Sequence, residues 1–311
     1  MAKVLISGIS GFIGSNLAPK LVASNHEVWG LVRNVSNRRY VPPEGVNVVF
    51  GDLTDPFFLN KTIKELKPEI VLHLGAQSSV SYGHSHSIEN IQINFEGTVN
   101  LAEANKQNNT NLERFIYAGT SEEYGNQEVL PIRESAPLHP NQPYAICKVA
   151  SDYYLNYLKR QGFPCIVARP FNTYGRTDNF AFLTESAIYQ FLTKDKVILG
   201  DPTPERDFLY VSDHVQAYVD LVEKDYDIFG VDTLNFCTGV CWSIRKWVEI
   251  IKELTESKKE IVWAGKRPTE ISKLVGSNAL AWKVLKWEPQ VDAYSGLSMT
   301  IEAIKRKLNC A

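Results

Sequence analysis

The feature that most constrains the fold is a glycine-rich turn near the N-terminus. A short apolar run over residues 3–7 leads into Gly8-x-x-Gly11-x-x-Gly14, and an amphipathic helix pattern begins at Phe12. Glycines between a strand and a helix let the backbone approach a pyrophosphate, whose charge then faces the helix N-terminus. The spacing differs from the G-x-G-x-x-G form, and a plain glycine turn is the alternative. The strand-turn-helix context favours a dinucleotide site.

Apolar runs and helical patterns alternate along the first half of the chain. The expected strands cover residues 3–7, 28–32, 46–50, 70–74, 115–118 and 165–168, and the expected helices cover residues 12–24, 59–66, 91–107 and 144–159. This alternation predicts an α/β fold with a doubly wound parallel (Rossmann) sheet. After residue 172 the pattern loosens, and turns separate the expected helices 244–254 and 297–308. We therefore assign residues 1–172 to a dinucleotide-binding domain and residues 173–311 to a smaller mixed α/β substrate lobe, some of whose later segments return to the sheet.

Composition excludes several classes of function. The formal net charge is −2, so nothing attracts the chain to nucleic acid or to a membrane surface. The N-terminal apolar run is too short for a signal peptide or a membrane span, which predicts a soluble, cytoplasmic protein. Five scattered cysteines predict free thiols. His84 and His86 have no third ligand in view, so no metal site is expected and they are interpreted as loop residues over the substrate.

The expected cofactor is a nicotinamide dinucleotide, and the end of the second strand indicates which one. Arg33 and Ser36 stand where an NAD site would have an acidic residue, and a guanidinium with a hydroxyl suits a 2′-phosphate. We therefore expect NADP rather than NAD, with a solvated basic loop as the alternative. Asp52, after the third strand, can accept a hydrogen bond from the adenine amine. The residues expected to bind the cofactor are Gly8, Gly11, Phe12, Ile13, Gly14, Arg33, Ser36, Asp52, Leu53, Leu74 and Ala76, together with Tyr144 and Lys148.

A second motif predicts acid–base chemistry. Tyr144 and Lys148 are four residues apart, so on a helix they share one face. An ammonium beside a phenol should lower the phenol pKa from about 10 towards neutrality, where it can take a proton from an alcohol. Thr120-Ser121-Glu122 directly follows an expected strand, at the carboxyl edge of the sheet. A surface Tyr–Lys pair and a helix N-cap are the alternatives, and the joint order and spacing favour a catalytic site.

At these residues the chain resembles the extended short-chain dehydrogenase/reductase family of nucleotide-sugar enzymes. The resemblance covers nearly the whole length, from Gly8 through Arg169-Pro-Phe-Asn172 and the run from Arg206 to Asp213 to Arg267-Pro-Thr-Glu270. Members that only epimerise carry small residues after the catalytic Ser or Thr, whereas 4,6-dehydratases carry a Glu two positions after it. The motifs are most similar to those of GDP-mannose 4,6-dehydratases. Three departures are the shorter chain, Glu123, which stands where an apolar residue is common, and the segment Arg176–Asn179, which matches loosely.

The resemblance implies a redox-neutral dehydration that uses NADP and converts GDP-mannose to a 4-keto-6-deoxy sugar nucleotide. Tyr144 would take the O4 proton with Thr120 bonded to the same oxygen. Glu122 would remove the C5 proton, and Glu122 or Ser121 would protonate the leaving C6 hydroxyl before hydride returns to C6. The residues implied in substrate binding are Ser78, Asn172, Arg206, Arg267 and Glu270. Arg206 and Arg267 would clamp the diphosphate, although Arg206 could instead pair with Asp207 or Asp213.

Other functions stay open at this point. A reductase of a 4-keto-6-deoxy sugar nucleotide would keep Thr120, Tyr144 and Lys148 but would not need Glu122. UDP-glucuronate decarboxylases also carry a Thr-Ser-Glu run, an epimerase is disfavoured by Glu122, and a non-enzymatic NADP sensor would need none of the triad. Two helices, 91–107 and 146–159, carry extra apolar residues (Val99, Leu101, Val149, Tyr153 and Tyr157), which predicts a homodimer or a dimer of dimers.

Overall fold

The central layer of the protein is a parallel sheet. A computed structural model describes residues 1–33, 41–78, 80–265 and 270–309. It contains a seven-stranded sheet in the order β11-β6-β5-β4-β1-β2-β3, with every neighbouring pair parallel. The strands are β1 (Lys3–Ser7), β2 (Glu27–Val32), β3 (Val46–Phe50), β4 (Ile70–His73), β5 (Arg114–Ala118), β6 (Cys165–Pro170) and β11 (Thr233–Phe236). The predicted doubly wound fold is confirmed.

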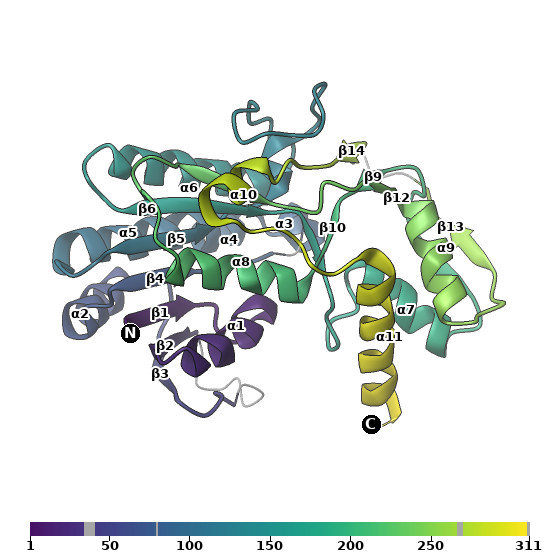
Figure 1. Ribbon diagram of the computed structural model, residues 1–311, viewed down its shortest axis with the longest axis horizontal. Helices are drawn as coiled ribbons and strands as arrows, with labels where there is room; N and C mark the ends of the chain where they lie inside the picture. The colour runs from purple at the N-terminus through teal and green to yellow at the C-terminus, as the bar shows by residue number, and fades with distance from the viewer. Residues whose placement is uncertain (34–40, 79, 266–269, 310–311) are drawn as a thin grey trace.

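Helices cover both faces of this sheet (Figure 1). On one face lie α1 (Phe12–Ala23), α8 (Val211–Glu223) and α10 (Ala279–Leu285), and on the other lie α2 (Pro56–Leu66), α5 (Gly97–Asn108) and α6 (Pro143–Lys159). Successive side chains of a strand point to opposite faces. Val4 and Ile6 therefore join the first core, and Leu5 joins the second. Burial on both faces explains why the strands read as continuous apolar runs.

The second half of the chain contributes to both the sheet and a separate lobe. β11 pairs with β6 at the edge of the main sheet, and α8 packs against α1. The lobe has its own core around Trp247 and the helices α7 (Leu183–Thr193), α9 (Ile244–Leu254) and α11 (Ala293–Asn309), which lie together beyond one end of the sheet in Figure 1. Its short strands are β7 (Asn172–Tyr174), β8 (Val197–Leu199), β9 (Glu205–Arg206), β10 (Phe208–Tyr210), β12 (Trp242–Ser243), β13 (Ile261–Trp263) and β14 (Lys273–Leu274).

The helix expected over residues 91–107 is divided in the structure. It consists of α4 (Ser87–Ile91), a π-helical segment η1 (Gln92–Glu96) and α5. Within η1 the buried Asn94 accepts a hydrogen bond from the Gln77 backbone N–H (2.8 Å) and donates one to the Gln77 carbonyl (3.1 Å). A hydrophobic pattern cannot reveal this change of helical pitch, because it depends on a long-range polar contact.

Local capping explains another difference from the expected boundaries. Helix α2 starts three residues earlier than the apolar pattern predicts, at Pro56. Asp55 is its N-cap and accepts a hydrogen bond from the Phe58 N–H at 3.0 Å, and proline is favoured in the first turn. The segment with the two histidines is also not a loop, since α3 spans Val80–Ser85 and His86 precedes α4.

Two of the residues expected at a subunit interface are buried inside the protomer. Leu101 has no exposed surface and Val149 is 7% exposed, because both pack within the chain. Tyr153 and Tyr157 are exposed, as expected. None of the helices in the described part of the chain combines the length and the apolar composition needed to cross a bilayer. Four of the cysteines, Cys147, Cys165, Cys237 and Cys241, are free thiols.

Candidate active site

One large cavity lies at the carboxyl ends of the central strands. Its volume of about 1550 Å³ exceeds that of a typical single-ligand pocket, roughly 300–1,000 Å³, so two ligands can lie in it together. Its walls bring together predicted residues that are far apart in the sequence: Gly8, Gly11, Phe12, Ile13, Gly14, Arg33, Asp52, Leu53, Leu74, Ala76, Ser78, Thr120, Ser121, Glu122, Tyr144, Lys148, Asn172, Arg206 and Glu270. Ser36 and Arg267 lie outside the described residues.

The glycine turn forms one end of this cavity. Gly8 has a φ of +75°, and a Cβ there would lie 2.7 Å from the Gly75 Cα. A Cβ on Gly14 would lie 2.5 Å from the Gly8 carbonyl oxygen. Gly11 is the N-cap of α1 and offers no side chain to its first N–H groups, and the first turn of α1 has no acidic residue. The turn therefore fits a dinucleotide diphosphate, which an uncapped helix N-terminus attracts.

The adenosine end of the predicted cofactor site is marked by Asp52 and Arg33. Asp52 Oδ1 accepts hydrogen bonds from the N–H and the hydroxyl of Thr54, both at 2.9 Å, which holds this carboxylate at the cavity wall. Arg33 is exposed and follows directly after β2. Both residues line the cavity at the carboxyl edge of neighbouring strands.

Three of the five predicted catalytic residues, Thr120, Tyr144 and Lys148, line the same part of the cavity wall. Thr120 follows β5 and is the N-cap of the 3₁₀ helix η2 (Ser121–Tyr124), where its hydroxyl accepts from the Glu122 N–H at 3.3 Å. The Thr120 and Tyr144 side chains are hydrogen-bonded. Lys148 lies one turn along α6 from Tyr144 and donates to the Ala118 carbonyl at 2.7 Å. The capping and the catalytic interpretations of Thr120 are thus compatible.

The predicted lowering of the Tyr144 pKa is wrong for the structure as described. Burial is the main cause that raises the pKa of Tyr144, and the charges of Glu123 and Glu122 add to it. The Lys148 ammonium lies 5.8 Å from the centroid of the Tyr144 ring and is directed at the Ala118 carbonyl. Burial also lowers the pKa of Lys148 to about 8. A spacing of four residues establishes a shared helix face, but burial decides the protonation states.

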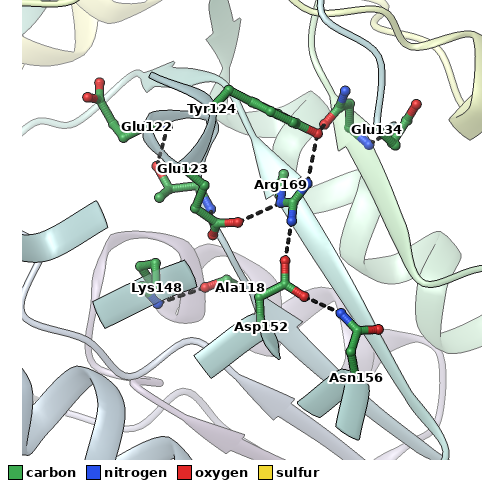
Figure 2. Close-up of polar contacts among 11 residues, drawn as sticks. Ala118, Glu122, Glu123, Tyr124, Glu134, Lys148, Asp152, Asn156 and Arg169 are labelled. Atoms are coloured by element: carbon green, nitrogen blue, oxygen red, sulfur yellow. Dashed lines mark hydrogen bonds and ion pairs between the residues drawn. The ribbon is translucent and has the colours of Figure 1, made fainter. Parts of the chain in front are cut away.

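Two adjacent glutamates of η2 point in opposite directions (Figure 2). Glu122 is partly exposed, lines the cavity and accepts from the Gln142 side chain at 3.3 Å. Glu123 is fully buried and is directed away from the cavity, towards Arg169. The sequence assigned no role to Glu123. The only signal was a charged residue at a position where related sequences are commonly apolar.

The predicted diphosphate clamp has a partner that the sequence did not indicate. Arg206 Nη2 lies 2.6 Å from Glu270 Oε1, so the alternative pairing of Arg206 with Asp207 or Asp213 is wrong. Both aspartates instead accept backbone N–H groups, Asp207 from Thr238 and Gly239 and Asp213 from Gln290 and Val291. The buried Asn172 Oδ1 has no hydrogen-bond partner among the described residues, and Asn172 lines the cavity, so this atom is available to a ligand.

Two further wall residues were missed by the sequence analysis. The Arg176 guanidinium lies 4.2 Å from the Phe12 ring centroid and 3.9 Å from that of Phe182, so it joins the glycine turn to the lobe. The ring of His214 accepts from or donates to Thr173 at 2.8 Å, and burial lowers the pKa of His214 to about 3, so it is neutral. Neither belongs to a local motif. The described residues contain no cluster of His, Cys, Asp and Glu that could hold a metal ion.

A doubly wound sheet with a glycine turn at β1 and a Thr–Tyr–Lys group beside it defines an extended short-chain dehydrogenase/reductase enzyme that acts on nucleotide sugars. The sequence model of the family described as GDP-mannose 4,6 dehydratase matches residues 5–300, and the chain belongs to that family.

Curated relatives of the chain have several activities. GDP-6-deoxy-D-mannose reductase of Pseudomonas aeruginosa is 31% identical, over 93% of this chain and 92% of its own length. UDP-glucose 4-epimerase of Mycolicibacterium smegmatis is also 31% identical, over 98% and 99%. Human GDP-mannose 4,6 dehydratase is 28% identical, over 92% and 87%. Family membership therefore does not by itself specify the reaction.

Solved structures agree with this class. UDP-glucose 4-epimerase of Thermotoga maritima with UDP-glucose has a TM-score of 0.91 at 27% identity, covering 98% of this chain and 99% of that one. The UDP-glucose 4-epimerase of Thermus thermophilus with NAD scores 0.88 at 26% identity, covering 97% and 99%. RMD from Pseudomonas aeruginosa complexed with NADPH has a TM-score of 0.81 at 26% identity, covering 99% of this chain and 100% of that one. These neighbours support a nicotinamide cofactor. Because they include both an NAD complex and an NADPH complex, they do not select between the two.

Proposed function

We propose that this protein is a nucleotide-sugar 4,6-dehydratase that converts GDP-mannose to GDP-4-keto-6-deoxy-mannose. The observation that carries the proposal is the position of Glu122. Its carboxylate lines the same cavity as Tyr144, two residues from Thr120, and its charge contributes to the raised pKa of Tyr144. Oxidation of an alcohol needs one base, whereas elimination of water needs a second group that takes the C5 proton. Glu122 is that second group.

The residues of the chain divide the proton transfers between them. Tyr144 takes the O4 proton of the hexose, and the Thr120 hydroxyl holds the same oxygen in line. Glu122 then removes the C5 proton, which the neighbouring C4 carbonyl acidifies. The C6 hydroxyl leaves as water with a proton from Glu122 or through Ser121. A final proton returns to C5, so the net change is loss of one water.

The proposed cofactor is NADP, bound along the glycine turn with its 2′-phosphate at Arg33 and Ser36. When bound, NADP would supply a hydride acceptor for C4 and a hydride donor for C6. The glycine turn and the N-terminus of α1 would hold the diphosphate, Asp52 would accept from the adenine amine, and Lys148 would contact the ribose beside Tyr144. Leu53, Leu74 and Ala76 would complete the apolar walls of this end.

The proposed substrate end is the wall that faces the C-terminal lobe. Arg206, fixed by Glu270, would contact the diphosphate of the sugar nucleotide together with Arg267, and the Asn172 side-chain N–H would donate to its phosphate oxygens. Ser78 would contact the hexose. We assign the end of the cavity around Arg206 to the nucleotide because the guanidinium there is held in place by Glu270.

The second candidate function is a reductase of a 4-keto-6-deoxy sugar nucleotide. The 31% identity to GDP-6-deoxy-D-mannose reductase over most of both chains favours it. A reductase would consume reduced cofactor stoichiometrically and would lose no water. An epimerase would leave the mass of the sugar nucleotide unchanged.

The test is incubation with a panel of nucleotide sugars, without added cofactor, followed by mass spectrometry. We expect one GDP-hexose to lose one water. In deuterated water, one solvent deuterium should enter C5 and none should reach C6 as hydride.

The Glu122→Gln variant tests the proposed role of Glu122 as the base that removes the C5 proton. It should bind the sugar nucleotide and transfer hydride to the cofactor, so the absorbance of the reduced form of the nicotinamide should rise. No dehydrated product should form. Glu128→Gln, an exposed glutamate of the next loop, is the matched control and should behave as wild type. Full dehydration by Glu122→Gln, or turnover only with added reduced cofactor, would refute the dehydratase.

A further inference from the structure

Glu123 has no exposed surface, although it directly follows the cavity residue Glu122. Its Oε1 accepts the backbone N–H of Thr120 at 2.9 Å, and its Oε2 accepts the Arg169 Nε–H at 2.6 Å (Figure 2). A buried carboxylate is costly unless it is paired and fully hydrogen-bonded. These contacts attach the segment that follows β5 to a cation on β6.

Arg169 extends the same contact to helix α6. Its Nη2 donates to Asp152, and its Nη1 donates to the Tyr124 hydroxyl at 3.0 Å. Asp152 is one turn beyond Lys148 on α6, and Lys148 is one turn beyond Tyr144, so all three lie on one helix face. The buried pair of Glu123 and Arg169 therefore links the segment that carries Thr120 to the helix face that carries Tyr144 and Lys148.

Glu123 also supplies negative charge to Lys148. The titratable groups that face Lys148 are His73 on β4, Tyr117 on β5, Cys147 and Tyr144 on α6, and Glu123 on η2. Burial lowers the pKa of His73 to about 3 and raises those of Tyr117, Cys147 and Tyr144, so these four are neutral near pH 7. Burial raises the pKa of Glu123, whereas the Arg169 guanidinium and the Thr120 N–H favour its charged form, so this ion-paired carboxylate is the source of negative charge beside Lys148.

We propose that Glu123 is a positioning residue, which holds Thr120 in place through its backbone N–H and keeps Lys148 in the ammonium form through its charge. It reaches no wall of the cavity itself. The importance of this residue for turnover rests on the proposed function. The effects of Glu123 on the position of Thr120 and on the charge of Lys148 do not depend on the proposed function, and they can be measured without any substrate.

The direct test is the Glu123→Gln variant, which keeps the size of the side chain and removes its charge. Loss of a nearby negative charge disfavours the ammonium, so the Lys148 pKa should fall by about 0.5–1 unit. The measurement is the pH titration of lysine ¹³Cε signals, with the Lys148 signal assigned by its absence in Lys148→Met. The alkaline limb of turnover should move to lower pH by the same amount.

Glu134→Gln is the matched control. Glu134 is a second carboxylate of the same cluster, whose charge also interacts with Arg169, but it accepts the Asn235 N–H at 2.9 Å and does not contact Thr120. This variant should leave the Lys148 pKa unchanged. An unmoved Lys148 pKa in Glu123→Gln, or an equal shift in Glu134→Gln, overturns the inference.

Glu123→Asp separates the charge from the geometry. The shorter side chain keeps the charge but cannot reach both Thr120 and Arg169, so the alkaline limb should stay and turnover should fall roughly ten-fold. Wild-type turnover in Glu123→Asp overturns the inference. This result decides the matter even if the Glu123→Gln variant does not fold. If no nucleotide sugar is turned over at all but the Lys148 pKa moves as stated, the proposed function fails and the electrostatic inference stands.

Discussion

At the scale of single residues, the protonation of Tyr144 is the central chemical question. Its neighbours and its burial favour the neutral phenol in the structure described. The phenol is hydrogen-bonded to Thr120, and Lys148 lies one turn away. A base of this kind must therefore become ionised within the assembled site, where bound ligands change the local charge. The hydroxyl itself is the group that the proposed chemistry requires.

The Tyr144→Phe variant keeps the ring and removes this hydroxyl. We expect turnover to fall by about two to four orders of magnitude, the usual range for loss of a general base. The thermal midpoint should change little, because the ring still fills its place. Tyr294→Phe, an exposed tyrosine of α11, is the matched control. Turnover within a factor of a few of wild type would exclude Tyr144 as the base.

At the scale of elements, a buried cation joins three of them. Arg169 on β6 pairs with Glu123 on η2 and with Asp152 on α6, and all three side chains are at most 4% exposed. Ion pairs buried to this degree gain little net free energy relative to apolar packing. Removal of one partner is different, because it leaves uncompensated charge in the interior.

Arg169→Met should therefore destabilise the protein strongly. Two buried carboxylates lose their cation, which corresponds to about 3–5 kcal/mol in the free energy of unfolding. Urea denaturation measures this change. The control is Lys196→Met, which removes one member of an exposed pair with Glu260 at 3.5 Å and should cost less than about 1 kcal/mol. Equal effects of the two substitutions would contradict the assigned role of Arg169.

At the scale of the whole molecule, one face carries unpartnered apolar side chains. Helices α4 and α6 pack against each other and expose Ile88 (75%), Ile91 (44%), Ile146 (52%), Tyr153 (62%) and Tyr157 (51%). Exposed apolar side chains on two helices that pack together are typical of a subunit interface. A symmetric contact would place the same two helices of a second copy against it.

We accordingly propose a homodimer, or a dimer of dimers, assembled through α4 and α6. Light scattering at micromolar concentration should give at least twice the mass of one chain. Tyr153→Lys places a charge on this face and should produce a folded monomer. Phe229→Lys, at an exposed apolar residue outside this face, should leave the assembly intact. A wild-type monomer, or an assembly that Tyr153→Lys does not affect, would contradict the proposal.

Much of this architecture could be predicted from the sequence because it is encoded locally. The central strands β1, β4, β5 and β6 each contain a continuous apolar run, since both faces of the sheet are covered there. The glycine turn is recognisable because Gly8 and Gly14 allow contacts that no other residue permits. The spacing of Tyr144 and Lys148 places both on one helix face before any packing is known.

The tertiary structure decided what depends on burial and on distant partners. Glu122 and Glu123 are adjacent and chemically identical, yet one lines the cavity and the other is buried against Arg169, 46 residues away. Arg206 pairs with Glu270 across 64 residues, rather than with an aspartate nearby in the sequence. The pKa of Tyr144 rises where the helical spacing predicted a fall, because burial and the charges of Glu123 and Glu122 raise it while the Lys148 ammonium is directed at the Ala118 carbonyl. Local patterns specify which elements form, whereas charge states and ion pairs follow from the low-polarity interior that only the assembled chain creates.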